Sequence, residues 1–270
     1  MQSLESFAGS ILLSREKIES SVASAFVSYT SVKQKSSHIG LASSGGTIKK
    51  VKKRSPERTL YEFLSLRVWH DLLQHYSLLS PLKLCAPLPL GVSHLETEES
   101  ALYMEFMPGY EVRKLGGQNL RRSFPVYIPE QETPVPLYPA CALYLGALDS
   151  IKELEGLCHG DYDVRHVIFK PFDSVSLAVI DVEGSRKDSF IEIDAESHRM
   201  FSDFERITPS HRDLSALRSW YEQGREMLSL NDRQPVFSEI SEKINREYDV
   251  EFNMESMSLN GVSLRERGST

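Results

Sequence analysis

The chain has 270 residues, of which 40% are hydrophobic and 26% charged, and its formal net charge at pH 7 is −7. This size and apolar content suit one large globular domain or two lobes that share a cleft. An acidic chain lacks the overall basic face that neutralises nucleic-acid phosphates, so a nucleic acid is not an expected partner. No run approaches the ~18 consecutive apolar residues of a transmembrane helix, and no membrane association is expected.

The three cysteines, Cys85, Cys141 and Cys158, are scattered singly. Without a CxxC pair they indicate neither a zinc site nor a disulfide framework. The N-terminal stretch carries Glu5 and has no basic region before its short apolar run, unlike a secretory signal. These features favour a cytoplasmic protein.

In the first part of the chain, the patterns predict a helix over residues 1–22, a strand over 25–31 and two strands over 38–53. Ser55-Pro56-Glu57 then has the features of a helix start: a capping serine, proline at the first position and an early acidic residue. The following residues place apolar side chains on one broad stripe, formed by Leu60, Phe63, Leu64, Val68 and Leu72.

Further on, residues 81–89 are rich in proline and extended. Strands are expected at 92–95 and 101–106, a loop at 113–135, a helix from 138 that ends at Gly156, and a hairpin between 167–169 and 177–180. Helices are expected over 192–228, interrupted at Pro209, and over 235–250. Strands thus dominate the first part and helices the second, which indicates the α+β class.

The most informative segment contains His159-Gly160-Asp161 and, across the predicted hairpin, Ile180-Asp181. Phosphoryl transfer needs oxygen ligands for a metal ion and a carboxylate that orients the acceptor hydroxyl. The two aspartates are 181 minus 161, or 20, residues apart, which is enough for a loop, two strands and a turn. Each then lies beside the end of an apolar strand.

This segment resembles the catalytic loop and metal motif of the protein-kinase-like superfamily, in particular the aminoglycoside phosphotransferase, RIO and KEOPS-complex kinases. The resemblance implies a two-lobed fold with a strand-rich N-lobe, a mainly helical C-lobe, ATP and Mg²⁺. It implies that Asp161 orients the acceptor hydroxyl and that Asp181 binds the metal. Where the family has a second metal ligand, Asn, this chain has His166 (161 plus 5). Imidazole suits softer metals such as Mn²⁺, and Asp163 is an alternative oxygen ligand.

Thr47-Ile48-Lys49 resembles the family strand whose lysine binds the α- and β-phosphates and pairs with a glutamate on the next helix. That glutamate would be Glu62, which follows after 62 minus 49, or 13, residues. Four lysines compete for the role: Lys49, Lys50, Lys52 and Lys53. We favour Lys49, because the small Thr47 lies two residues before it on the same face of the strand.

Residues 101–109 resemble the family's linker between the lobes, where backbone groups contact adenine. Glu105 and Met107 would supply these contacts. A phosphate-binding glycine loop is poorly marked, with Gly45-Gly46 and Gly40 as candidates.

The sequence therefore predicts an N-lobe at residues 1–107 with an N-terminal helix, a C-lobe at 108–258 and a mobile tail at 259–270. The expected activity is ATP-dependent phosphoryl transfer to a hydroxyl of a small molecule or a protein. The alternative is a pseudokinase that acts as a nucleotide-binding or protein-binding regulatory module, favoured by His166 in place of asparagine. A third interpretation is an interaction protein without a nucleotide site.

Overall fold

The computed structural model describes residues 29–33, 37–42, 47–53, 56–93, 99–115, 124–129, 131–208, 211–228, 233–260 and 262–263. The chain divides into two compact units. Unit 1 comprises Met1–Val68, Pro87–Phe106 and Ser238–Thr270, and unit 2 comprises Trp69–Ala86 and Met107–Phe237. Unit 1 holds the largest sheet and unit 2 most of the helices, so the predicted α+β fold is confirmed. The predicted lobe limits at residues 107 and 258 remain predictions.

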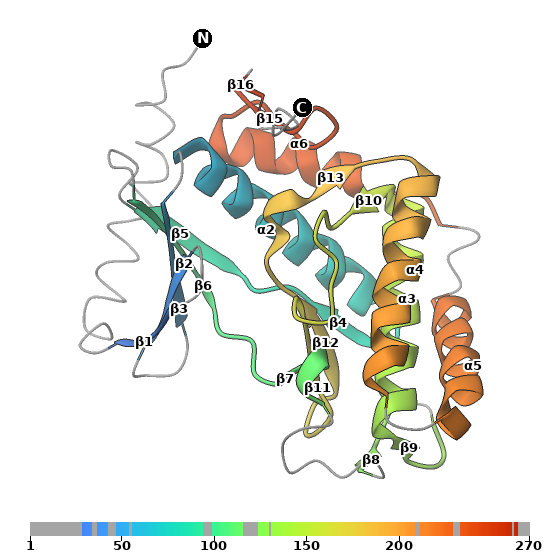
Figure 1. Cartoon of the computed structure of the whole chain (residues 1–270). Coiled ribbons are helices and arrows are strands. Elements are labelled where there is room, and N and C mark those ends of the chain that lie inside the picture. Colours follow the sequence, from blue (N-terminus) through green and yellow to red (C-terminus); the bar gives the residue numbers. More distant parts are fainter. Residues whose placement is uncertain are drawn as a thin grey trace, which may run out of the picture. The chain divides into compact units, whose positions relative to one another are not determined.

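Unit 1 is built on a five-stranded antiparallel sheet (Figure 1). Its strands, in spatial order, are β1 (Tyr29–Lys33), β2 (Ser37–Ala42), β3 (Thr47–Lys53), β6 (Glu99–Glu105) and β5 (Pro89–Ser93). The central strand β3 pairs with β2 and β6, and Lys50 lies opposite Leu102. The strands predicted at 38–53 and 101–106 are confirmed. The predicted helix at 1–22 and the glycine-loop candidate Gly45-Gly46 lie outside the described residues.

The helix α2 (Pro56–Ser77) begins at the proline that the sequence indicates. Its first part belongs to unit 1, where α6 (Phe237–Tyr248) and the short strand β14 (Phe252–Asn253) pack against it. The ring of Tyr61 lies 5.1 Å from that of Phe252, and Phe63 meets Tyr248 edge to face at 5.5 Å. A small sheet joins β14 to β15 (Ser258–Leu259) and β16 (Val262–Ser263), and of these three strands only Leu259 and β16 fall within the predicted tail at 259–270.

The prediction of a single apolar stripe on α2 was wrong. The expected residues are buried, but so are side chains on other faces of the helix, including Tyr61, Glu62, Ser65 and Trp69. Two of the buried polar groups have partners: Glu62 pairs with Lys50, and Trp69 Nε1 donates to the Ser185 hydroxyl. Periodicity finds the apolar residues but misses polar side chains that are buried in pairs.

Unit 2 contains a four-stranded sheet in the order β4 (Lys83–Cys85), β12 (Ser176–Val179), β11 (Val167–Lys170) and β7 (Tyr110–Glu111). The strand β12 runs parallel to β4 and antiparallel to β11, which confirms the predicted hairpin. Short pairs join β10 (Leu157–Cys158) to β13 (Arg186–Lys187) and β8 (Pro125–Val126) to β9 (Val135–Pro136). The 3₁₀ turns η1 (Val112–Lys114) and η2 (Val182–Gly184) follow β7 and β12.

The helical part of unit 2 is centred on α3 (Leu137–Glu155), which is buried along most of its length. It packs against α4 (Phe190–Ile207) and α5 (His211–Met227) (Figure 1). The crossing with α5 is close enough to require glycine: a Cβ on Gly146 would lie 1.9 Å from the Tyr221 carbonyl oxygen, and one on Gly224 would lie 1.9 Å from that of Leu143. The helix ends at Gly156, whose left-handed conformation is typical of a helix C-terminus. Among the described residues, no helix is both long and apolar enough to cross a bilayer.

Candidate functional site

The β11–β12 hairpin of unit 2 brings the two predicted aspartates to the same end of the sheet. Val167 pairs with Val179, and the Ile180 N–H donates to the His166 carbonyl over 2.9 Å, so the pairing continues one step beyond the strands. Asp161 lies on the loop that leads into β11, and Asp181 lies two residues after the end of β12. Asp181 has a left-handed backbone (φ 61°), which turns the chain into η2.

These two loops cross at a pair of glycines. Gly160 has φ 90°, a conformation that L-residues with a side chain rarely adopt, and a Cβ there would lie 2.1 Å from the Gly184 carbonyl oxygen. The backbones of the loops therefore touch one residue away from Asp161 and three residues beyond Asp181. This crossing fixes the separation of the two carboxylate-bearing segments.

The buried His159 side chain ties the same loops together. Its Nε2 lies 2.9 Å from the Ile180 carbonyl oxygen, which only accepts, so Nε2 carries the hydrogen and Nδ1 faces the Asp161 N–H at 3.4 Å. The Ser185 hydroxyl donates to the His159 carbonyl over 3.2 Å and accepts from Trp69 Nε1 over 2.8 Å. Burial lowers the pKa of His159 to about 4, so the ring is neutral at pH 7.

This buried histidine predicts acid sensitivity. Its folded-state pKa lies below the ordinary value of 6.5, so its contribution to stability is full above pH 6.5 and is lost as the pH falls toward 4. Between pH 7.5 and pH 5 we expect it to lower the unfolding free energy by about 2 kcal/mol. Denaturant melts across this range measure the loss, and His159→Gln should flatten the curve. An equally steep curve in the variant would assign the acid sensitivity to other groups.

Beneath the crossing, Glu196 of α4 holds the loop of Asp161 by its backbone. Its two carboxylate oxygens accept from the N–H groups of His159 (3.0 Å) and Gly160 (2.7 Å). Lys152 of α3 lies 3.1 Å from Glu196 and 3.2 Å from Asp149, and its side chain is fully buried. Burial alone would raise the pKa of Glu196, but Lys152 and the His159 N–H together hold it below its usual value.

The structure brings three of the predicted site residues together: Asp161, His166 and Asp181. The Asp161 side chain is 66% exposed and that of Asp181 is 29% exposed. The imidazole of His166 lies between them, with Nδ1 3.5 Å from Asp161 Oδ2 and Nε2 3.6 Å from Asp181 Oδ2. The arrangement offers one exposed carboxylate to a reactant, and a carboxylate and an imidazole to a cation.

Asp163, the alternative metal ligand, has other partners. Both of its carboxylate oxygens accept from the Arg165 side chain, at 2.8 and 3.2 Å, and one also accepts from the Arg165 N–H. Partial burial would raise the pKa of Asp163, but these bonds to Arg165 hold it below its usual value. A metal-binding role for Asp163 therefore stays a prediction without support from this geometry.

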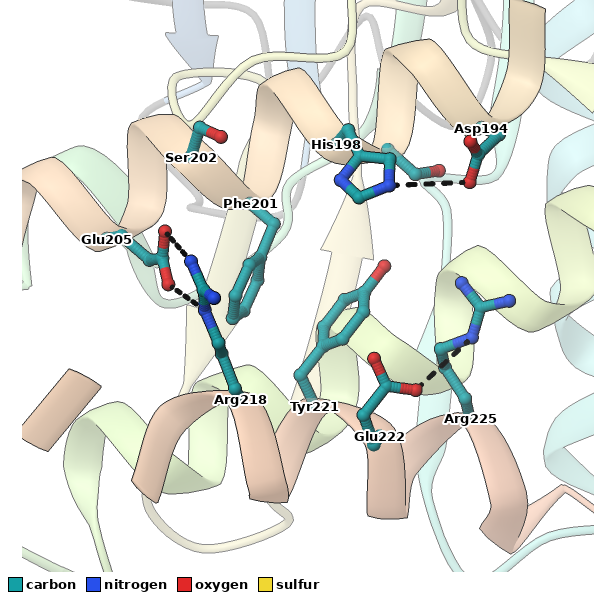
Figure 2. A pocket seen from close by; sticks show the side chains of 10 residues that line it. Asp194, His198, Phe201, Ser202, Glu205, Arg218, Tyr221, Glu222 and Arg225 are labelled. Carbon is teal, nitrogen blue, oxygen red and sulfur yellow. Dashed lines mark hydrogen bonds and ion pairs between the residues drawn. The ribbon is translucent and has the colours of Figure 1, made fainter. Parts of the chain in front are cut away.

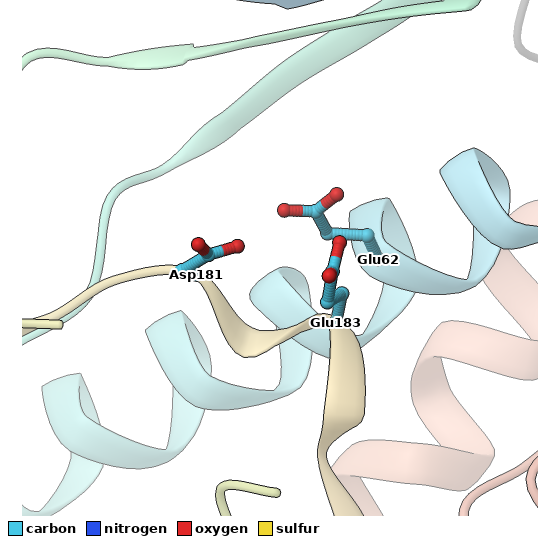
Figure 3. A group of neighbouring side chains, drawn as sticks. All are labelled: Glu62, Asp181 and Glu183. Carbon is cyan, nitrogen blue, oxygen red and sulfur yellow. The ribbon is translucent and has the colours of Figure 1, made fainter. Parts of the chain in front are cut away.

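Glu183 was missed by sequence reasoning. It lies two residues after Asp181 on η2, and carboxylate oxygens of the two residues lie within 4.8 Å of each other. Figure 3 shows both side chains on this turn; Glu62, also drawn there, belongs to unit 1. Carboxylates are ligands that Mg²⁺ and Mn²⁺ accept, so Glu183 joins Asp181 and His166 as a candidate ligand.

In unit 1, the choice of Lys49 as the partner of Glu62 was wrong. Lys50 makes the pair, with its Nζ 2.5 Å from Glu62 Oε1 and both side chains buried. The side chain of Lys50 lies on the face of β3 that is turned toward α2, since it reaches Glu62 there. Contact of Lys49 with a phosphate stays a prediction.

The predicted adenine contacts fall where β6 ends. Glu105 is the last residue of β6, and its N–H donates to the Leu88 carbonyl over 2.9 Å. Met107 follows two residues later as the first residue of the next segment of unit 2. Their contact with a nucleotide stays a prediction.

A pocket of about 250 Å³ lies between α4 and α5 (Figure 2). The rings of Phe201 and Tyr221 are part of its lining, and their centroids lie 4.3 Å apart. Its charged residues already pair with one another, as in the two hydrogen bonds from Arg218 to Glu205. We therefore assign no ligand to it.

The sequence matches no family model and no curated protein. Solved structures similar to this chain include WaaP in complex with acyl carrier protein (14% identity, TM-score 0.45, 85% of this chain and 92% of WaaP). Another is the Rio2 kinase complex with ADP/Mg²⁺ and phosphoaspartate from Chaetomium thermophilum (14% identity, TM-score 0.45, 89% of this chain and 76% of Rio2). A third is an aminoglycoside phosphotransferase from Streptomyces rimosus (11% identity, TM-score 0.45, 88% of this chain and 97% of the phosphotransferase). All three TM-scores are below 0.5, so the function proposed below rests on the chain's own residues.

Proposed function

We propose that the chain is an ATP-dependent phosphotransferase that moves the γ-phosphoryl group to a hydroxyl of a small molecule or a protein. The observation that carries this proposal is the convergence of Asp161, His166 and Asp181, with the imidazole within 3.6 Å of both carboxylates. Phosphoryl transfer depends on positioning and charge stabilisation, and this loop pair offers fixed groups for both.

Asp161 is the group proposed to receive the acceptor. Its side chain is more exposed than those of His166 and Asp181. The His159 ring accepts from its backbone N–H, and Glu196 accepts from the N–H of the preceding residue, Gly160. A carboxylate so placed orients a hydroxyl and takes its proton as the phosphoryl group is transferred.

Asp181 and His166 are the proposed metal ligands, with Glu183 as a further carboxylate at the turn. A divalent metal ion bound there would supply positive charge to the phosphate oxygens of ATP. In unit 1, Lys50, held by Glu62, is proposed to bind a nucleotide phosphate in the role first expected of Lys49.

Turnover tests this proposal. We expect release or transfer of the γ-phosphate from ATP with Mg²⁺ or Mn²⁺. Asp161→Asn should reduce the rate by about 10²–10⁴-fold, the usual contribution of a general base, while nucleotide binding is kept. Asp181→Ala should abolish turnover and weaken metal-dependent nucleotide binding. The proposal is wrong if both variants keep the wild-type rate. Glu192→Ala, an exposed change on α4, is the matched control.

A second candidate is a pseudokinase that binds nucleotide or protein without turnover. The position of His166 favours it, because a protonated imidazole would pair with both carboxylates and occupy the place of a metal. Nucleotide binding without turnover in any metal would support this candidate, and turnover with either metal would exclude it.

A further inference from the structure

Both the backbone and the imidazole ring of His166 are held by neighbouring groups. Its backbone N–H donates to the Asp163 carbonyl and its carbonyl accepts from the Ile180 N–H, both over 2.9 Å. Its ring stacks on that of His159, with centroids 6.2 Å apart and planes 13° apart. Nδ1 lies 2.8 Å from the Asp161 carbonyl oxygen, and the side chain is 15% exposed. The ring therefore has one orientation in this structure.

These contacts decide which nitrogen carries the hydrogen. The Asp161 carbonyl only accepts, so Nδ1 must donate to it, and the lone pair of a neutral ring then lies on Nε2. Nε2 faces Asp181 Oδ2 at 3.6 Å. Metal-bound histidines show the same pattern, because their second nitrogen usually donates to a carbonyl or carboxylate.

We propose that His166 Nε2 and the Asp181 carboxylate bind a divalent transition-metal ion of the Mn²⁺ type, in preference to Mg²⁺. Atoms bound to one such ion lie about 3 Å apart, close to the separation seen here. Mg²⁺ favours all-oxygen octahedral sites, whereas imidazole favours transition metals. This inference rests on the proposed function, since it names the metal of that site.

Pulsed EPR of Mn²⁺ bound to the wild-type chain tests the inference without any measurement of activity. The expected result is a ¹⁴N coupling from a directly bound imidazole, both without nucleotide and with ADP. Competition with Mg²⁺, followed by the signal of free Mn²⁺, should show tighter binding of Mn²⁺. Wild-type spectra without nitrogen coupling would overturn the inference.

His166→Asn supplies an oxygen ligand in the same place. It should remove the ¹⁴N coupling and weaken Mn²⁺ binding by about tenfold or more, the lower end of what even indirect ligand changes cost. His198→Asn, at an exposed position of α4, is the matched control and should keep both. Nitrogen coupling that persists in His166→Asn would also overturn the inference. Circular dichroism verifies that His166→Asn is folded. If it is unfolded, His166→Gln takes its place in the same measurements.

The two proposals fail in different ways. A chain that transfers phosphoryl groups equally well with Mg²⁺ and Mn²⁺ and shows no nitrogen coupling would overturn this inference and leave the proposed function standing. A chain that binds Mn²⁺ through His166 but neither binds nor cleaves ATP would support the metal site and overturn the proposed function.

Discussion

Replacing Glu196 by alanine is expected to lower the unfolding free energy by about 3–5 kcal/mol, the usual cost of breaking a buried ion pair. The change leaves Lys152 with an uncompensated share of its charge and removes the acceptor of two backbone N–H groups. The loop of Asp161 loses its support from α4, so turnover should also fall, by about 10²-fold for a displacement of roughly 1 Å.

Urea denaturation and turnover measure these effects, and two variants separate their causes. Glu192→Ala lies on the exposed part of the same helix and should stay within about 0.5 kcal/mol of wild type. Adding Lys152→Met to Glu196→Ala leaves the buried Asp149 without its cation, so it should lower the stability further and should not restore the turnover. A Glu196→Ala protein with wild-type stability and rate would show that the carboxylate does not support the loop.

Gly160→Ala is expected to disrupt the crossing of the two loops. The left-handed backbone adds about 1–3 kcal/mol of strain for a residue with a side chain, and the clash with the Gly184 carbonyl adds about 1–3 kcal/mol more. Any relief moves Asp161 away from Asp181, so turnover and metal binding should both fall. The measurements are thermal melts, turnover and Mn²⁺ affinity.

Gly156→Ala provides the matched control for that variant. Gly156 also has a positive φ, of 61°, but the nearest atom to a Cβ there would be the flexible end of Lys187, at 3.2 Å, and the nearest backbone atom, the Asp188 oxygen, lies at an ordinary contact distance of 3.9 Å. It should cost about 1 kcal/mol and leave turnover unchanged. Equal effects of the two alanines on turnover would mean that the crossing itself has no role in the site.

The centre of the site could be predicted from the sequence because it is local. The loop of Asp161, the strands 167–170 and 176–179 and the turn at Asp181 follow one another within about two dozen residues, so turn chemistry and apolar runs were enough. The interlocking of the loops at Gly160 and Gly184 was not predicted, because a close backbone approach leaves no pattern in one sequence.

The lysine partner of Glu62 could not be predicted, because it depends on register between distant strands. Strand alternation separates Lys49 from Lys50 but does not say which face turns toward α2. That choice follows from the pairing of β3 with β6, in which Lys50 lies opposite the buried Leu102. The residues of β6 next to Leu102 are apolar on both faces of the strand, so the sequence pattern does not show which face turns toward α2.

The sequence does contain an indication that Glu196 is buried. The buried face of α4 is formed by Ile193, Met200 and Phe204, and Glu196 lies on that face at helical spacing. A carboxylate within an apolar stripe needs a buried partner, and this requirement points to backbone donors or a lysine on a neighbouring element. Which element supplies them depends on tertiary packing, which the sequence alone does not give.

The central claim is that the turn at Asp181 binds a metal-bound nucleotide, and the melting shift with ATP tests it most directly. At a ligand concentration of 100 times Kd, binding to the native state adds about 2.7 kcal/mol of stability. We predict a clear rise in Tm with ATP and Mn²⁺, a smaller one with ATP alone, and loss of the metal-dependent part in Asp181→Ala. No rise in any condition, or the same metal-dependent rise in Asp181→Ala, would contradict the claim.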